Sequence, residues 1–495
     1  MEKKLSVNRH EHYQGNVGGN FAKRQEMELN KSKMKLLPTL VLLLVGQITF
    51  GQDRIQRIDS LLNALSADQK INGNVLIAEH GKVIYKHSFG NANEEKKQKL
   101  EENSVFELAS VSKQFTAMAI MILKEKKLLN LEDNFTTYIP ELSHYKGITI
   151  RNLLNHTGGL PDYEEVMDTL FDKNKIAINQ DIITLYAKHH PKILFEPNTK
   201  WKYSNTGYAL LASVIEKVSG MNYGDYLNKV IFKPMKMNNT TVFRRRYTTQ
   251  QIKNYALGYV FSDSLKKYIL PDDFAETKYV VWLDGIVGDG TVNSNVMDLL
   301  KWDRALYSNN LLSAEGMKEI FEVATLKDNS KTKYGFGWFI EDNADFGKSV
   351  AHSGGWPGYK TFIDRNITND KTIIILQNHE NVTIPVKSIR AILYNKPLPK
   401  PMVRKEIPLS MEQLAPFLGI YEVEKGFEIK ITLEKDQLFA QLTGQSSFPI
   451  FAESEVSFFL KVVEAQLQFE KNEKGEVIKV YLVQNGNKME AKRIK

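Results

Sequence analysis

The chain contains no cysteine at any of its 495 positions. This absence excludes disulfides, cysteine-ligated metal sites, thiol catalysis and a lipid anchor on an N-terminal cysteine. A strong charge imbalance is also missing. The formal net charge is +8, and residues 1–52 already hold eight Lys or Arg against four Asp or Glu. The remainder is only mildly basic, so the sequence predicts no nucleic-acid partner and no general attraction to a membrane surface.

The apolar run Leu36–Phe50 is shorter than a membrane span. It comprises fifteen residues after a basic flank, whereas a transmembrane helix needs about 20. Thr49 and Gly51 are small residues at the usual −3 and −1 positions, which predicts a signal peptide cleaved before Gln52. We therefore expect an exported protein, periplasmic or secreted, without a transmembrane span after cleavage. The alternative is an uncleaved N-terminal membrane anchor.

The length exceeds what one compact domain usually holds. Hydrophobic and charged fractions of 42% and 25% are typical of a soluble globular protein. Four prolines between positions 395 and 408 predict a linker. We expect four parts: an N-terminal extension with the signal peptide (1–52), a main domain (53–394), a Pro-rich linker (395–410) and a small antiparallel β domain (411–495).

Strand patterns lie at both ends of the main domain, with helical patterns between them. Asn74–Gly90 predicts a hairpin around the His80-Gly81 turn. The later strand patterns are Tyr334–Glu341, Ser349–Gly355, Tyr359–Arg365 and Lys371–Asn378, followed by a helix at Val386–Tyr394. The intervening helical patterns include Phe115–Leu129, Ile150–Asn155, Thr206–Ser219 before Gly220, and Asn295–Leu306, which opens at capping-box spacing with Asp298. This order predicts an α+β fold: one sheet built from distant segments, flanked by helices, with an inserted helical subdomain.

Beyond the linker the residues alternate between apolar and polar at period two. The turn pairs Lys435-Asp436, Lys474-Gly475 and Asn485-Gly486 interrupt this alternation. Closely spaced strands of this kind predict a small all-β barrel or sandwich.

A possible nucleophile and its base lie in "FELASVSKQFTAMAI" (Phe106–Ile120), where Lys113 follows Ser110 by three residues. Residues three apart share one helix face, so the amine can reach the hydroxyl. Four other Ser-x-x-Lys pairs occur, beginning at Ser32, Ser143, Ser264 and Ser330. Only Ser110 opens a strongly apolar helix, whose N–H groups and dipole stabilise an anion. The alternative is that Ser110 is a plain N-cap.

A serine hydroxyl becomes an effective nucleophile only when a base takes its proton. A lysine can do so where burial or neighbouring cations favour the neutral amine. The leaving group then needs a proton donor, such as a tyrosine beside cations, and the oxyanion needs two N–H donors.

Three motifs carry a resemblance: Ser110-Val-Ser-Lys113, Tyr203-Ser-Asn205 and His352-Ser-Gly354. In this order they resemble the motifs of penicillin-recognising serine enzymes, which include class C β-lactamases, DD-peptidases, D-aminopeptidases and related esterases. The resemblance covers about Arg54 to Tyr394 and implies a β-lactamase/DD-peptidase-like antiparallel sheet flanked by helices. The C-terminal part resembles the small β domains, barrel or lipocalin-like, that are often appended to this family.

Two decoy motifs compete with the second and third of these. Tyr307-Ser-Asn309 lies at the end of a predicted helix, and His156-Thr-Gly158 precedes Tyr203, out of order. We therefore select Tyr203 and His352.

The resemblance implies a role for each site residue. Ser110 is the nucleophile, Lys113 and Tyr203 share the proton relay with either as the formal base, and Asn205 positions Lys113 and the substrate amide. His352 tunes Tyr203 and, with Ser353 and Gly354, orients the substrate. The backbone N–H groups of Ser110 and Gly355 form the oxyanion hole. No metal and no cofactor is implied. The aromatic residues Tyr163, Trp282, Trp356 and Tyr359 either line the cleft or pack elsewhere.

The third motif departs from the β-lactamases, which have Lys where this chain has His352. A histidine is only partly charged near neutrality, so we expect activity to change around pH 6–7. Carboxypeptidase, aminopeptidase or esterase activity is favoured over efficient β-lactam hydrolysis.

We therefore predict a serine hydrolase that acts through an acyl-enzyme on an amide or ester. Its partner would be a small-molecule or peptide substrate: a D-amino-acid peptide, a peptidoglycan-type cell-wall peptide, an ester or a β-lactam. The alternative is a penicillin-binding sensor or pseudo-enzyme that is acylated without turnover.

Overall fold

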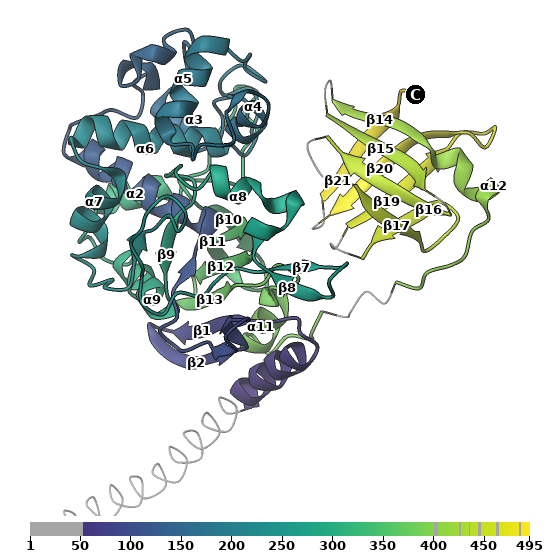
Figure 1. The fold of residues 1–495 in the computed structure, drawn as a ribbon, viewed down its shortest axis with the longest axis horizontal. Helices are drawn as coiled ribbons and strands as arrows, with labels where there is room; N and C mark the ends of the chain where they lie inside the picture. The colour runs from purple at the N-terminus through teal and green to yellow at the C-terminus, as the bar shows by residue number, and fades with distance from the viewer. Residues whose placement is uncertain are drawn as a thin grey trace, which may run out of the picture. The chain divides into compact units, whose positions relative to one another are not determined.

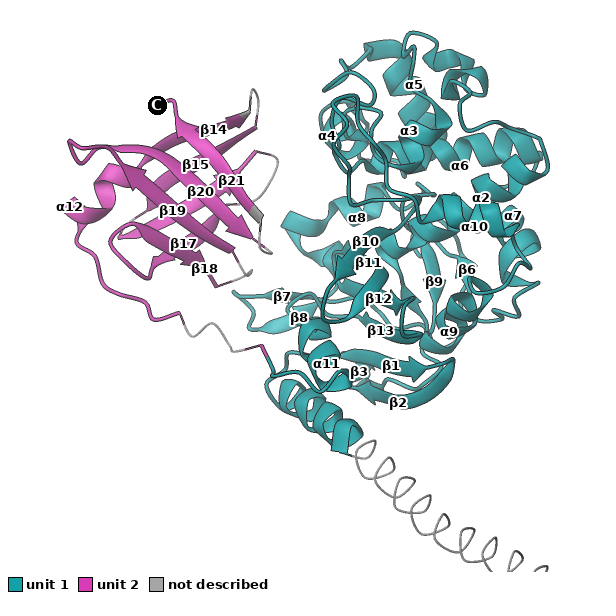
Figure 2. Ribbon diagram, turned by 180° about the vertical axis from the view of Figure 1, so that it is seen from behind, with its two compact units in different colours: residues 1–398 teal, residues 399–495 magenta. Residues whose placement is uncertain are grey.

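The computed structural model describes residues 53–399, 404–424, 427–434, 436–443, 447–461, 465–484 and 487–495. The predicted signal peptide, its anchor alternative, Lys435 and the Asn485-Gly486 turn lie outside these ranges. The chain divides into two compact units, Met1–Leu398 and Pro399–Lys495 (Figure 2), and the division falls within the predicted linker. Within the described residues, no helix combines the length and the apolar character that crossing a membrane requires.

The first unit is built on a six-stranded antiparallel sheet whose strands come from both ends of the unit (Figure 1). Its order is β10-β11-β12-β13-β1-β2. The strands are β1 (Gly73–Glu79), β2 (Lys82–Phe89), β10 (Phe339–Asn343), β11 (Gly347–Trp356), β12 (Tyr359–Asn366) and β13 (Lys371–Gln377). Val75 of β1 pairs with Ile375 of β13. The prediction of one sheet assembled from distant segments is confirmed.

Both faces of the central strands are buried. Successive side chains of a strand point to opposite faces. Val75 and Ile77 therefore join a core with the helix at residues 53–67 and with α11 (Val386–Leu393). Leu76 and Ala78 join the core of the helical part instead. A strand covered on both faces needs a continuous apolar run rather than alternation, which is what β1 and β13 show.

Most of the remaining helices come from the segment between β2 and β10. They are α2 (Lys113–Glu125), α3 (Ile150–Leu154), α4 (Tyr163–Leu170), α5 (Asn179–His189), α6 (Asn205–Ser219), α7 (Tyr223–Leu227), α8 (Tyr279–Trp282), α9 (Val296–Ala305) and α10 (Ala314–Ile320). α2 is buried from Lys113 to Leu123. α6 ends at Gly220, whose φ of 67° is the left-handed C-cap that the sequence predicts.

The start of α9 realises only half of the predicted capping box. The Asn295 side chain accepts from the Asp298 N–H. The Asp298 carboxylate instead accepts hydrogen bonds from the N–H of Asn239 and from Lys301 Nζ. It therefore joins two segments instead of closing the box.

The strand predicted from Tyr334 begins only at Phe339. Gly337 adopts a φ of 78°, and a Cβ there would lie 2.9 Å from the backbone of Lys113 and Gln114. The chain turns at this glycine against the start of α2, which prevents an extended conformation until β10 begins.

A small three-stranded sheet has the order β5 (Phe106–Glu107), β9 (Val292–Ser294) and β6 (Thr241–Val242), and β5 lies directly before the Ser110 segment in the chain. The remaining short strands form two-stranded pairs: β3 (Asn91–Asn93) with β4 (Gln98–Lys99), and β7 (Val260–Ser262) with β8 (Lys267–Ile269).

The second unit is a closed eight-stranded antiparallel barrel, so the barrel, not the sandwich, is the observed form. Its strands are β14 (Gly419–Glu424), β15 (Phe427–Glu434), β16 (Gln437–Leu442), β17 (Phe448–Ala452), β18 (Ser457–Leu460), β19 (Ala465–Lys471), β20 (Val477–Gln484) and β21 (Asn487–Arg493). β21 pairs with β14 and closes the ring. A short helix, α12 (Met411–Leu414), precedes β14. Phe417, Tyr421 and Leu467 are fully buried in the barrel core.

We expect residues 53–398 and residues 404–495 to fold independently, because each hydrophobic core is drawn from residues of its own unit. Calorimetry of each fragment should show a cooperative transition that reproduces one in the intact chain. Aggregation of the 53–398 fragment, or dye binding typical of a partly folded chain, would contradict this expectation.

Candidate active site

Ser110 lies in a short 3₁₀ turn, Ala109–Ser112, that runs directly into α2. Neither the turn nor α2 has a side-chain N-cap, so the alternative that Ser110 is a plain N-cap is wrong. Ala109 has a φ of 47°, a conformation that costs energy for a non-glycine residue. Thr361 Oγ1 donates a 2.7 Å hydrogen bond to the Leu108 carbonyl and helps to hold this turn.

The Lys113 amine is completely buried and contacts three oxygen atoms. Its Nζ lies 3.1 Å from Ser110 Oγ, 2.9 Å from Asn205 Oδ1 and 2.8 Å from the Asp289 carbonyl oxygen. The amide and carbonyl oxygens can only accept, whereas a serine hydroxyl can donate or accept. A neutral amine would therefore donate to Asn205 and Asp289 and accept from Ser110 without any rearrangement.

Asn205 is held in one orientation from both ends of its side chain. Its Oδ1 accepts from Lys113, and its Nδ2 donates to Glu164 Oε1 at 3.2 Å. Because the two partners have opposite hydrogen-bonding character, they fix which end of the amide faces the lysine.

Tyr203 directly precedes the α6 N-cap, Ser204. Its hydroxyl is buried and has no hydrogen-bond partner among the described residues. The Lys113 Nζ lies 4.9 Å from the centre of its ring. A buried hydroxyl without a partner is unfavourable, so a bound group that supplied one would be stabilised there.

His156, the decoy of the third motif, supports Tyr203. Its ring lies 4.4 Å from the Tyr203 ring, its Nδ1 accepts from the Ser204 N–H, and its carbonyl accepts from the Lys202 N–H. Burial, followed by the charge of Lys113, holds the pKa of His156 well below its ordinary value. The side chain is therefore a neutral support for the Tyr203 loop, which the motif comparison did not reveal.

His352 is only 2% exposed, and both ring nitrogens have partners in the chain. Nδ1 lies 2.6 Å from the Ser353 carbonyl and Nε2 lies 2.9 Å from the Tyr334 hydroxyl. A neutral ring satisfies both, donating from Nδ1 and accepting at Nε2. Burial lowers the pKa of His352 to about 3, and Lys113 adds to the effect. The expectation that this imidazole titrates around pH 6–7 is therefore wrong.

The rings of His352 and Tyr203 lie 6.1 Å apart, and no hydrogen bond joins them. His352 therefore contacts Tyr203 by packing alone. Its predicted role in orienting the substrate stays a prediction.

The other residues of the third motif face different surroundings. Ser353 is exposed on β11. A Cβ on Gly354 would lie 2.2 Å from the Leu108 carbonyl oxygen, so glycine is needed here for close packing of β11 against the Ser110 turn. A Cβ on Gly355 would meet no atom within 4 Å, so this residue faces open space. The approach of a substrate backbone is therefore unobstructed at Gly355 but blocked by the chain itself at Gly354.

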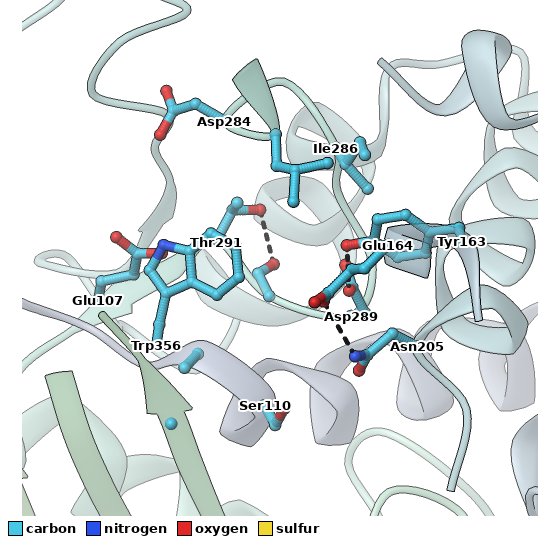
Figure 3. Close-up of a pocket in the computed structure, with 14 residues that line it drawn as sticks. Glu107, Ser110, Tyr163, Glu164, Asn205, Asp284, Ile286, Asp289, Thr291 and Trp356 are labelled. Atoms are coloured by element: carbon cyan, nitrogen blue, oxygen red, sulfur yellow. Dashed lines mark hydrogen bonds between the residues drawn. The ribbon is translucent and has the colours of Figure 1, made fainter. Parts of the chain in front are cut away.

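A cavity of about 60 Å³ lies beside Ser110, Asn205 and Gly355 (Figure 3). Its lining includes four acidic residues that the motif comparison did not identify: Glu107, Glu164, Asp284 and Asp289. These carboxylates come from three separate segments, with only Asp284 and Asp289 close together in the sequence, so no single local motif predicts the set. Only Glu107 could have been recognised in the sequence, because it is an acidic residue inside the apolar stretch "VFELA".

The acidic groups have different environments. Burial and the Asp284 charge raise the pKa of Glu107 to about 7, while Arg246 and Arg245 oppose the rise. Burial, with Asp162 and Asp289, also raises the pKa of Glu164.

Two of the four aromatic residues considered above line this cavity. They are Tyr163, whose hydroxyl donates to Asp289 Oδ2 at 2.9 Å, and Trp356. Trp282 stacks on Phe171, outside the cavity lining. The hydroxyl of Tyr359 is bound to the Ala256 carbonyl, also outside it.

The competing motifs lie elsewhere. Tyr307 is 44% exposed, after the end of α9, and its ring packs against Arg304 and Arg365. The serines of three other Ser-x-x-Lys pairs, Ser143, Ser264 and Ser330, are exposed, and Ser32 lies outside the described residues. In the part of the chain that the structure describes, no group of three or more His, Cys, Asp or Glu side chains could hold a metal ion.

Comparisons with known proteins match both units. The β-lactamase family profile matches residues 58–401, and a domain of unknown function, DUF3471, matches residues 403–493. The chain is 40% identical over 452 residues to penicillin-binding protein 4* of Bacillus subtilis. The matched region covers 90% of this chain and 100% of that protein.

Two solved structures share the fold. The octameric penicillin-binding protein homologue from Pyrococcus abyssi is 23% identical, with a TM-score of 0.58 over 88% of this chain and 100% of its own. The D-amino acid amidase from Ochrobactrum anthropi SV3, solved with L-phenylalanine, is 24% identical, with a TM-score of 0.52 over 63% of this chain and 89% of its own.

We predict that His352 stays neutral from pH 8 to pH 5. Its pKa is lower in the folded protein than in the unfolded chain, where it is near 6.5. It therefore contributes stability that is fully present above about pH 6.5 and is lost as the pH falls towards 3. The NMR spectrum of protein with ¹³C-labelled histidine identifies the His352 resonance as the one that disappears in His352→Gln. Between pH 8 and pH 5 this resonance should keep the chemical shift of a neutral imidazole ring. A midpoint near 6.5 for that resonance would contradict the prediction.

Proposed function

Because the chain belongs to the β-lactamase family of serine hydrolases, which includes penicillin-binding proteins, we propose that it hydrolyses an amide or ester through an acyl-enzyme on Ser110. The contact of 3.1 Å between Lys113 Nζ and Ser110 Oγ is the observation that supports this proposal most directly. It pairs a nucleophile with a buried base whose other two contacts already satisfy a neutral amine.

In the proposed reaction Ser110 Oγ attacks the substrate carbonyl carbon, and its proton passes to Lys113 Nζ. The carbonyl oxygen becomes an oxyanion next to the backbone N–H groups of Ser110 and Gly355, both of which line the cavity. Collapse of this intermediate breaks the bond to the leaving group, which takes a proton. Water then attacks the acyl-enzyme, and the released Ser110 oxygen recovers its proton.

Lys113 is the better candidate for the first proton transfer, because it alone of the two proposed bases is hydrogen-bonded to Ser110. The unpartnered Tyr203 hydroxyl suits the second transfer, to the leaving group. A substrate atom would supply the partner that this hydroxyl lacks among the described residues.

The substrate class follows from the family and the site together. D-amino-acid peptides, peptidoglycan-type peptides and esters require the same acyl-transfer groups, and a relative of this fold is named a D-amino acid amidase. The proposal includes export to the periplasm or the exterior, where cell-wall peptides occur.

The direct test compares two serines in the same sequence pattern. Ser110→Ala should reduce hydrolysis of a p-nitrophenyl ester to the background rate, because the nucleophile is lost. Its free energy of unfolding should fall by no more than about 1–3 kcal/mol, because this hydroxyl caps no helix but is one of the three partners of the buried Lys113 amine. The matched control is Ser143→Ala, in the exposed pair with Lys146, which should keep the wild-type rate.

Full activity in a folded Ser110→Ala protein would refute the proposal. A single burst of p-nitrophenol, equal to the enzyme concentration and without turnover, would instead indicate the acylated sensor.

A further inference from the structure

The cavity beside Ser110 is lined by acidic and uncharged residues only. Among the 14 described residues that line it, four are Glu or Asp and none is Lys, Arg or His. In the view of Figure 3, Glu107 lies on one side, Glu164 and Asp289 lie on the other, and Ser110 lies between them. This distribution favours a positively charged group in the cavity and disfavours a negative one.

Three of the four acidic side chains already have partners in the protein. Asp284 forms an ion pair of 3.0 Å with Arg246. Asp289 accepts from the Tyr163 hydroxyl, and Glu164 accepts from Asn205. These bonds fix the three carboxylates and satisfy part of their hydrogen-bonding capacity.

Glu107 differs from the other three. Its side chain makes no hydrogen bond and no ion pair with any residue that the structure describes, yet it is only 8% exposed. A largely buried carboxyl group without a partner is unfavourable in its charged form. Its elevated pKa, about 7, agrees with that environment. Arg245 and Arg246 act on Glu107 only through their charge, so a cation bound in the cavity would supply the direct partner that this carboxyl group lacks.

The acyl part of the substrate is the part that must fit this cavity. In the proposed function it stays bonded to Ser110 until water attacks, whereas the leaving group has to depart. A cavity of about 60 Å³ suits a compact acyl group. Leu283 and Ile286 provide apolar contacts for it.

We propose that this site selects compact acyl groups that carry an ammonium group, and that the Glu107 carboxylate binds this ammonium. The inference rests on the proposed function, since it assigns the substrate class of the same site. A charge-assisted hydrogen bond from the ammonium to Glu107 discriminates against an acyl group of the same shape without charge. Glu107 is thus a specificity-determining residue, distinct from the groups that move protons.

The test uses two anilides of the same shape. Alanyl p-nitroanilide and isobutyryl p-nitroanilide differ only by an ammonium group in place of a methyl group, and both enantiomers of the alanyl compound are assayed. For the wild-type protein we expect kcat/KM to be about 10- to 100-fold higher for the better alanyl enantiomer than for the isobutyryl compound. Most of the difference should appear in KM.

Glu107→Gln keeps the shape of the side chain and removes its charge, so it should reduce this preference to less than about threefold. Glu141→Gln is the matched control, because Glu141 is exposed and lies outside the cavity lining. The control should retain the full preference. If Glu107→Gln does not fold, the wild-type comparison of the two anilides decides alone.

Hydrolysis of p-nitrophenyl isobutyrate in the same preparations separates this inference from the proposed function. Ester turnover that depends on Ser110, without a preference for the alanyl anilide, overturns the ammonium inference only. A preference that persists in Glu107→Gln overturns the assignment to Glu107. Absence of all ester turnover overturns the proposed function and the inference with it.

Discussion

The arrangement of the first unit depends on one interaction, the contact of the buried Lys113 amine with three oxygens from separate segments. Ser110 comes from the turn before α2, Asn205 from the first residue of α6, and the carbonyl of Asp289 from the loop before β9. A lysine buried in this way is tolerable only when its hydrogen bonds are satisfied. The turn before α2, the start of α6 and the loop before β9 have to pack together to supply all three oxygens.

The surrounding acidic groups follow from the same constraint. The charge of a protonated Lys113 would lower the pKa of Glu164 and of Asp162, against the larger effect of burial. It also contributes to keeping His156 and His352 neutral. Burial is the larger cause of each shift, and the Lys113 charge modifies it by favouring ionised carboxyl groups and uncharged imidazoles. With the Lys113 contacts satisfied within the chain, the cavity wall itself remains acidic, which is the basis for expecting a cationic acyl group.

The parts of this arrangement that are local in the sequence were predictable. The apolar runs of β1 and β13 and the glycine after α6 indicate the sheet and the helix end directly. The ordered motifs bring Ser110, Lys113 and Asn205 together, as the resemblance implied. What depends on burial was not predictable. His352 looks like a titrating group until its enclosure by Tyr334 and Ser353 is seen, and Glu107 is separated by more than fifty residues from each acidic residue that shares its cavity. Barrel and sandwich were equally compatible with the C-terminal pattern, because the closing pair of β14 and β21 joins opposite ends of the unit.

The central claim is that Lys113 activates Ser110 as a nucleophile. It is tested most directly by labelling with a fluorophosphonate, which forms a stable adduct with activated serines. Digestion and mass spectrometry should locate the adduct on Ser110, and Lys113→Gln should lower the labelling rate by about 10² or more. Labelling of a different serine, or an equal rate in a folded Lys113→Gln protein, would contradict the account.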